Sequence, residues 1–291
     1  MTSWLWRRRV CLLALAFCLA GLGYSGLIVL VLQDTSHSER NFEQSSTDTP
    51  PIHLYAELIA VDPVRSALDF RLDFATESTS VGPVYSGQVD RDTVIQLADG
   101  DSVQRLTLHS GQLLESRNVS IDISRGSVWR FPFDRYMAAL TISIYPGSEQ
   151  HEQKLRPFHL TMWERLPGWE LDASIIKPSD EARGLALSVR VRRPILHVIF
   201  ATALYTATSV LGITAITIGA LMFVGSRKMD STFAAVLAAM LFTIPGLRSL
   251  MPGAPPLGVA ADVIFLLAAE LAVIASLALV IFTWATRRQE H

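Results

Sequence analysis

The chain has 291 residues, of which 50% are hydrophobic and 18% are charged, and its formal net charge is −2. This near-neutral charge argues against a nucleic-acid partner. A mean hydropathy of +0.32 suits a membrane protein that also carries a sizeable polar domain.

Four apolar runs indicate membrane-spanning helices. A helix needs about 20 apolar residues to cross a hydrocarbon core of about 30 Å. The sequence predicts such helices at 10–32, 194–224, 231–250 and 261–285. The third is marginal in length because Pro245 and Gly246 interrupt it.

The first run has features of both an anchor and a signal peptide. Arginines at 7–9 precede it, as in a signal peptide. Its apolar stretch is longer than the 7–15 residues usual for a signal sequence. We therefore expect an uncleaved anchor, with a cleaved signal as the alternative. Cys11 and Cys18 both lie in this run, so the rest of the chain contains no cysteine and no disulfide.

Basic residues at the ends of the runs predict the orientation. Lys and Arg are enriched in cytoplasmic loops. Such residues lie at 7–9, 227–228 and 287–288, which fall on one side of a four-helix arrangement. The N-terminus (1–9) and the tail (286–291) are then cytoplasmic, and the expected location is the bacterial plasma membrane. Residues 33–193 and a Pro- and Gly-rich hairpin at 251–260 then lie outside.

The long middle segment is typical of β-structure. Residues 33–51 are polar and rich in Ser and Thr, which favours a flexible tether. From 52 to 193 apolar and polar residues alternate, as in half-buried strands, and we expect about eight strands. The predicted fold class is membrane α plus all-β. Four transmembrane helices carry an extracytoplasmic antiparallel β-sandwich between the first and second.

The loop Phe131-Pro132-Phe133-Asp134 is the most distinctive segment of this domain. Two exposed phenylalanine rings are costly in water. Either both rings fold back into the core of the sandwich, or the loop docks against the ends of the membrane helices.

The same loop resembles one in the outer domains of pentameric ligand-gated ion channels. The similarity extends to Trp169-Glu170-Leu171 and to the strand end Arg192-Arg193-Pro194. It implies a sandwich whose loop meets the membrane helices, with Phe131, Pro132, Phe133, Asp134, Arg192 and Arg193 as coupling candidates. The chain departs from the channels in lacking their loop-closing cysteines and in having one helix before the domain and three after it.

A second resemblance covers most of the chain. Residues 241–262 read LFTIPGLRSLMPGAPPLGVAAD, and together with 131–136 they are similar to a family of bacterial integral membrane proteins, domain of unknown function 4436. We expect the similarity to run from about 50 to 288. It implies an architecture and no activity.

Charged residues in the C-terminal third are the remaining candidates. Arg248 and Asp262 stand at the two ends of the 251–260 hairpin and either mark the membrane interface or form an ion pair. Glu270 follows Asp262 by nine residues, which places it about 13 Å deeper at the helical rise.

A charge at that depth costs at least about 2.5 kcal/mol, so Glu270 needs an explanation. Hydroxyls on the second run, including Thr206 and Ser209, are potential hydrogen-bond partners. A proton or cation site at Glu270 is one alternative, and a pair between Glu270 and Arg248 is another.

No motif for a nucleophile, a metal or a phosphate-binding loop is present in the sequence. We therefore predict no catalytic residues, no cofactor and no metal. The favoured hypothesis is a non-enzymatic envelope protein that contacts membrane lipid and binds another envelope protein or a second copy of itself. A channel-like or transport oligomer is the alternative. A lipid or wall-precursor enzyme using Arg248, Asp262 and Glu270 is the third hypothesis.

Overall fold

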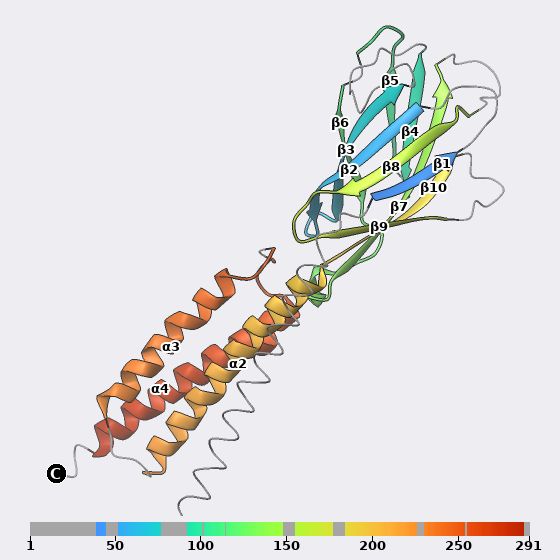
Figure 1. The fold of residues 1–291 in the computed structure, drawn as a ribbon. Coiled ribbons are helices and arrows are strands. Elements are labelled where there is room, and N and C mark those ends of the chain that lie inside the picture. Colours follow the sequence, from blue (N-terminus) through green and yellow to red (C-terminus); the bar gives the residue numbers. More distant parts are fainter. Residues whose placement is uncertain are drawn as a thin grey trace, which may run out of the picture.

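The computed structural model describes residues 39–44, 52–76, 92–100, 102–113, 115–147, 155–176, 184–225, 230–253 and 255–287. The described residues form a β-domain at one end and a group of helices at the other, joined end to end (Figure 1). The expected first span, 10–32, and its basic flank at 1–9 lie outside the described residues, so no fourth helix is described.

Ten strands make up the described part of the β-domain, against about eight expected. They are β1 (Glu39–Gln44), β2 (Ile52–Asp62), β3 (Ala67–Thr76), β4 (Thr93–Asp99), β5 (Ser102–Leu108), β6 (Arg117–Asp122), β7 (Arg135–Pro146), β8 (Phe158–Glu164), β9 (Glu170–Ile175) and β10 (Leu185–Arg192). They form two five-stranded sheets, ordered β1-β8-β2-β3-β6 and β5-β4-β7-β10-β9. All neighbouring strands are antiparallel except β2 and β8, which are parallel.

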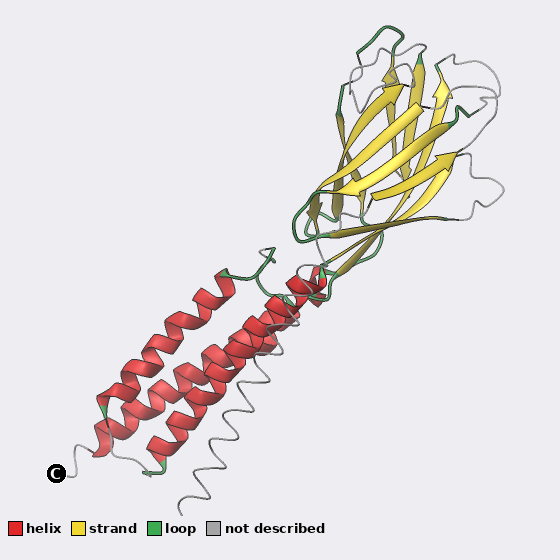
Figure 2. Cartoon of the chain, viewed as in Figure 1, coloured by secondary structure: helices red, strands yellow, loops and turns green. Residues whose placement is uncertain are grey.

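The strands lie together at one end of the chain, apart from the helices (Figure 2). The core of the β-domain combines buried residues from both sheets. Phe70 and Leu160 of one sheet and Ile142 and Leu187 of the other are almost fully buried in one cluster. These residues belong to the alternating patterns, because side chains in a strand point to opposite faces in turn. Each such side chain contributes about 1.5–3 kcal/mol on burial, which is how a domain without cysteine is held together.

One part of the predicted tether is not a tether. Residues 39–44, inside the polar segment 33–51, form β1 at the edge of a sheet and pair with β8 from Glu39↔Trp163 to Gln44↔Phe158. An edge strand takes its stability from ladder hydrogen bonds, and here Phe42 packs against the core. Such a strand leaves little trace in the pattern of hydrophobic residues.

Three described helices are long and apolar enough to cross a membrane. Helix α2 covers Ile195–Phe223 and α3 covers Ser231–Ser249. The last begins as a π-helix, η2 (Asp262–Leu267), and continues as α4 (Ala268–Arg287). Each lies within about two residues of an expected span. Strand β10 ends at Arg192 and α2 begins at Ile195, so only two residues join the β-domain to the helices.

Candidate functional site: the junction between the β-domain and the helices

The loop between β6 and β7 reaches from the β-domain to the helices. It begins with a short 3-10 helix, η1 (Val128–Arg130), and continues through a cis Phe131–Pro132 peptide. The Phe131 ring is 3% exposed and belongs to a cluster made by the helical part. The other buried members of this cluster are Ala201, Tyr205, Met251, Val259 and Ala261.

The two phenylalanines of the loop have different positions. Phe131 packs against α2 and the connection between α3 and η2, whereas Phe133 is 66% exposed. The expectation that both rings return to the core of the β-domain is therefore wrong. Phe131 docks against the helices, as the second alternative predicts. Phe133 is exposed, which neither alternative predicts. Pro132 is buried beside them.

A buried ion pair lies beneath the loop. The Nε of Arg193 is 3.3 Å from Oδ2 of Asp134, with side chains that are 4% and 0% exposed. The Tyr136 hydroxyl donates to the same Oδ2 at 2.9 Å. The other carboxylate oxygen, Oδ1, has no hydrogen-bond partner among the described residues. The charge of Asp134 is thus balanced by the single arginine of the strand–helix connection.

Aromatic rings enclose the guanidinium of Arg193. Its Cζ lies 3.7 Å from the centre of the Trp169 ring and 5.5 Å from that of Phe131. The Trp169 and Tyr136 rings meet edge to face at 5.6 Å. A desolvated cation over a Trp face is stabilised by about 2 kcal/mol. The rings therefore help to offset the cost of burying the arginine.

Gly253, in the connection after α3, completes the enclosure. Its φ is +72°, and a Cβ at this position would overlap Nη1 of Arg193. Glycine adopts this backbone conformation without strain and leaves room for the guanidinium. Arg193 therefore contacts the β-domain on one side and the α3–η2 connection on the other.

Burial raises the pKa of the Tyr136 phenol above its usual range, and the neighbouring Asp134 carboxylate raises it further. The phenol therefore stays neutral and keeps donating its hydrogen bond to Asp134.

Arg192 is placed differently from Arg193. Its Nε lies 2.7 Å from Oε2 of Glu170 on β9, and its side chain is 62% exposed. Of the two adjacent arginines, Arg193 belongs to the buried contact and Arg192 to the surface.

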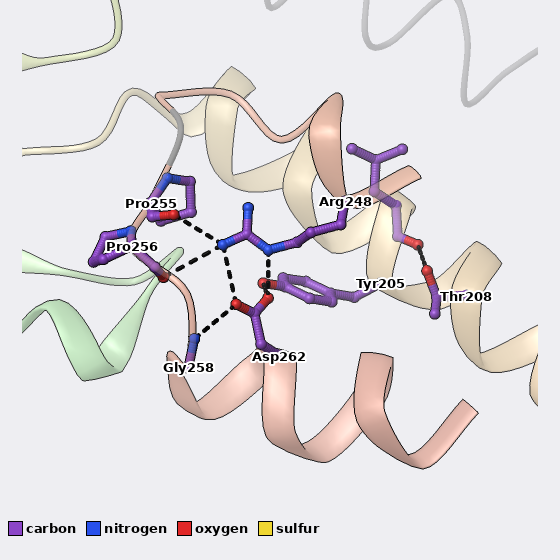
Figure 3. A network of polar contacts seen from close by, with 8 residues as sticks. Tyr205, Thr208, Arg248, Pro255, Pro256, Gly258 and Asp262 are labelled. Atoms are coloured by element: carbon purple, nitrogen blue, oxygen red, sulfur yellow. Dashed lines mark hydrogen bonds and ion pairs between the residues drawn. The ribbon is translucent and has the colours of Figure 1, made fainter. Parts of the chain in front are cut away.

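A second polar network holds the α3–η2 connection (Figure 3). Nη2 of Arg248 donates to Oδ2 of Asp262 at 3.0 Å, and its Nε lies 2.9 Å from Oδ1. The Tyr205 hydroxyl of α2 donates to Oδ1 at 2.7 Å. Arg248 also donates to the Pro255 carbonyl at 2.8 Å. Of the two alternatives for Arg248 and Asp262, the ion pair is the one that forms, and it ties all three helices together.

The side chains predicted to bind Glu270 make other contacts. Thr206 donates to the Thr202 carbonyl and Ser209 to the Tyr205 carbonyl, both within α2. Thr206 is exposed on the helix surface. Glu270 is half-buried and makes no hydrogen bond or ion pair with another described residue. The proposed hydrogen bond from α2 and the pair with Arg248 are therefore absent from the described part of the chain.

Helix α2 contacts α4 through a face different from the one that carries Thr206. Its buried residues alternate in steps of four and three: Ala201, Tyr205, Thr208, Gly212, Ala215, Gly219 and Met222. Gly212 lies against Ala269 and Gly219 against Ser276. Small residues let helix backbones approach closely within a membrane. The small residues of this face set the approach of the two helices, and Thr206 and Ser209, the hydroxyls expected to reach a neighbouring helix, are not among its buried residues.

A groove of about 890 Å³ opens beside the junction. It lies between the ends of β7, β9 and β10, the turn from β8 to β9, and the first turn of α2. Its charged lining residues are Arg40, Arg135, Arg165, Arg190, Arg192, Glu164, Glu170 and Asp172. Five arginines against three carboxylates leave the lining net positive, in a chain whose total charge is −2.

Sequence reasoning did not single out Tyr136, Tyr205 or Gly253. Tyr205 offered a usable signal, because a hydroxyl within an apolar helix needs a hydrogen-bond partner. Gly253 lies in the hairpin predicted at 251–260, and no local pattern reveals that an arginine 60 positions earlier lies against it.

Metal binding finds no support in the described residues, where no group of three or more His, Cys, Asp and Glu side chains is placed to hold an ion.

The fold and the junction define a class of protein: a two-sheet β-domain fixed by a buried ion pair to helices that can span a membrane. The chain belongs to the family described as Domain of unknown function (DUF4436), whose model matches residues 42–192. A second family model, Domain of unknown function (DUF8686), matches residues 193–287. No curated protein matches the chain.

The two family models divide the chain between Arg192 and Arg193, where the strand passes into the helix connection. Residues 241–262, which resemble the DUF4436 family in sequence, fall within the DUF8686 match. The predicted membership of the first family is confirmed, and its model matches the β-domain.

Proposed function

We propose that this protein is a non-enzymatic integral protein of the bacterial plasma membrane whose β-domain binds a partner in the cell envelope. The β-domain faces the outside, and the chain termini face the cytoplasm.

The observation that carries this proposal is a row of rings on the sheet face that points away from the core. His53 and His159 stack at 5.0 Å between ring centres, and Tyr55 and Trp163 approach to 5.6 Å. All four rings are half-buried and come from the neighbouring strands β2 and β8. Aromatic residues are enriched at the centres of protein interfaces. We call these four residues the aromatic row.

The junction supports a membrane position. Trp129 and Phe133 of the β6–β7 loop are 54% and 66% exposed, and Leu257 of the α3–η2 connection is 87% exposed. The cluster around Phe131 joins these two segments, so the exposed apolar side chains share one end of the helices. Trp and other apolar side chains at this position suit the membrane–water interface.

Site-specific photo-crosslinking from native membranes tests the proposal. A photoreactive residue is placed at Tyr55, at Trp163 and, as the control, at Arg105, an exposed residue of β5 in the other sheet. We expect one common crosslinked species from positions 55 and 163 and none from 105. No adduct from either position of the aromatic row, or the same adduct from all three positions, would overturn the proposal.

A channel-like or transport oligomer is the second candidate, and Glu270 favours it. A carboxyl in a membrane helix that has no partner among the described residues is typical of an ion or proton pathway. The test is ion flux into vesicles that contain the purified protein, with Glu270→Gln as the variant. Flux that Glu270→Gln abolishes would support this candidate, and an absence of flux from a monomeric protein would exclude it.

The hypothesis of an enzyme that uses Arg248 and Asp262 has less support. Arg248 and Asp262 bind each other, Tyr205 and backbone groups, so both carboxylate oxygens of Asp262 and two of the three guanidinium nitrogens of Arg248 are already engaged.

A further inference from the structure

Three arginines of the groove have no partner among the described residues. Arg40 pairs with Asp172 and Arg192 with Glu170. The guanidinium groups of Arg135, Arg165 and Arg190 make no hydrogen bond or ion pair with another described residue. Two of the carboxylates in the lining are therefore already neutralised. The remaining charged groups of the groove are these three arginines and the buried Glu164, which leaves the groove net positive.

The strand register gathers the positive charge. Arg135 of β7 lies directly opposite Arg192 of β10, and Arg190 lies two residues earlier on the same face of β10. Like charges directly opposite each other on adjacent strands are destabilising. An anion held between the guanidinium groups would remove this repulsion.

The first turn of α2 adds a second source of positive potential. Pro194 and His197 line the groove, and no side chain caps the start of the helix. The uncapped amides of a first turn carry partial positive charge and favour a nearby anion. This turn also lies at the end of the helices that exposes Trp129, Phe133 and Leu257.

We propose that the groove is a binding site for a phosphate-bearing anion, held by Arg135, Arg190 and Arg165. Guanidinium groups bind phosphate oxygens through paired hydrogen bonds, and arginine is the residue best suited to this geometry. A volume of about 890 Å³ accommodates a group larger than phosphate alone, such as a phospholipid headgroup.

Two sources share this chemistry: an anionic phospholipid of the surrounding membrane, and a soluble phosphate ester. Only the lipid source rests on the proposed membrane position. The aromatic row is not part of the groove, so a failed crosslinking test would leave this proposal standing, and the reverse also holds.

Native mass spectrometry of the full chain, released from a neutral detergent, measures the binding. The probes are phosphatidylglycerol, phosphatidylcholine and glycerol 3-phosphate. The test variant is Arg135→Gln/Arg190→Gln, and Arg105→Gln is the matched control, an exposed arginine of the same sheet outside the groove. Arg135→Lys/Arg190→Lys retains the charge but not the forked geometry.

We expect phosphatidylglycerol to bind at least about tenfold more tightly than phosphatidylcholine. The glutamine variant should weaken this binding at least about tenfold, because two charge-assisted contacts are lost. The lysine variant should bind with intermediate affinity, and Arg105→Gln should leave binding unchanged. Competition by glycerol 3-phosphate at an affinity close to that of the lipid assigns the soluble source, and failure to compete assigns the lipid.

The proposal is overturned if the glutamine variant binds phosphatidylglycerol as the parent does, or if Arg105→Gln weakens binding as much as the double change. Both changed side chains are exposed and have no partner within the described part of the chain, so the variants should fold, which an unchanged unfolding temperature verifies.

Discussion

The Arg193 guanidinium and the Asp134 carboxylate, 59 residues apart in the chain, meet at 3.3 Å with side chains that are almost fully buried. Arg193 belongs to the connection between β10 and α2, and Asp134 to the loop that docks on the helices. The contact therefore links the docked loop to the β10–α2 connection. The β-domain is attached to the helices at these two points.

Removing one partner of this pair should destabilise the protein strongly. Asp134→Asn leaves the Arg193 charge buried without compensation, and Arg193→Met does the same to Asp134. Breaking a buried ion pair from one side costs about 3–5 kcal/mol. We expect a clear fall in the unfolding temperature of the full chain, followed by circular dichroism. Arg192→Gln, at the neighbouring exposed pair, is the control and should cost at most about 1 kcal/mol.

The double variant Asp134→Asn/Arg193→Met distinguishes loss of the contact between the two residues from independent effects of each change. It removes both charges, so it should be less destabilised than the sum of the single changes. If the losses of stability from the two single changes simply added in the double variant, the two residues would act independently, and their contact would not link the loop to the β10–α2 connection.

The parts of the fold that follow from local pattern were predictable. The alternation in 185–191 and in 68–74 marks residues whose neighbours along the strand have opposite environments, and these residues form the observed core. The helix positions follow from length and apolar content alone. Such signals are carried by adjacent residues and need no knowledge of the tertiary structure.

The contacts of the site depend on distant residues, and there the sequence was less informative. The sequence identified the 131–134 loop as a candidate but did not decide where its rings pack. A phenylalanine gives the same sequence signal whether it is buried in the β-domain core or against the helices. The hydroxyls of α2 were a misleading signal for a related reason: Thr206 and Ser209 bond their own backbone, which satisfies them without a neighbouring helix. The arginine groove exists only because the register places Arg135 opposite Arg192.

Gly253→Ala should disturb the junction more than Gly258→Ala does. Both glycines have positive φ, so alanine at either position costs about 1–2 kcal/mol in backbone strain. Only at 253 would the new methyl group overlap Arg193, since nothing lies within 4 Å of a Cβ at 258. We expect a lower unfolding temperature for Gly253→Ala than for Gly258→Ala. Equal losses would show that Arg193 moves aside at no cost.

Tyr136 should give the protein an alkaline limit of stability. Its folded-state pKa is raised above the ordinary value of 10.0, so folding favours the neutral phenol. The resulting stabilisation is fully present below pH 10 and is lost as the pH rises towards the folded-state pKa. Unfolding temperatures measured between about pH 8 and pH 12 should therefore fall at the alkaline end, and less steeply in Tyr136→Phe. Parallel curves for the two proteins would contradict this assignment.

The contact between α2 and α4 should depend on its glycines. At Gly219 a Cβ would lie 3.1 Å from Cβ of Ser276, whereas at Gly246 on α3 nothing lies within 4 Å. A leucine at 219 must force the two helices apart, and overpacking of this kind costs about 1–3 kcal/mol. We expect Gly219→Leu to lower the unfolding temperature of the detergent-solubilised chain and Gly246→Leu to leave it unchanged or raise it, because glycine within a helix is itself unfavourable. If both leucines had the same effect, the small residues of α2 would not be what sets the approach of α4.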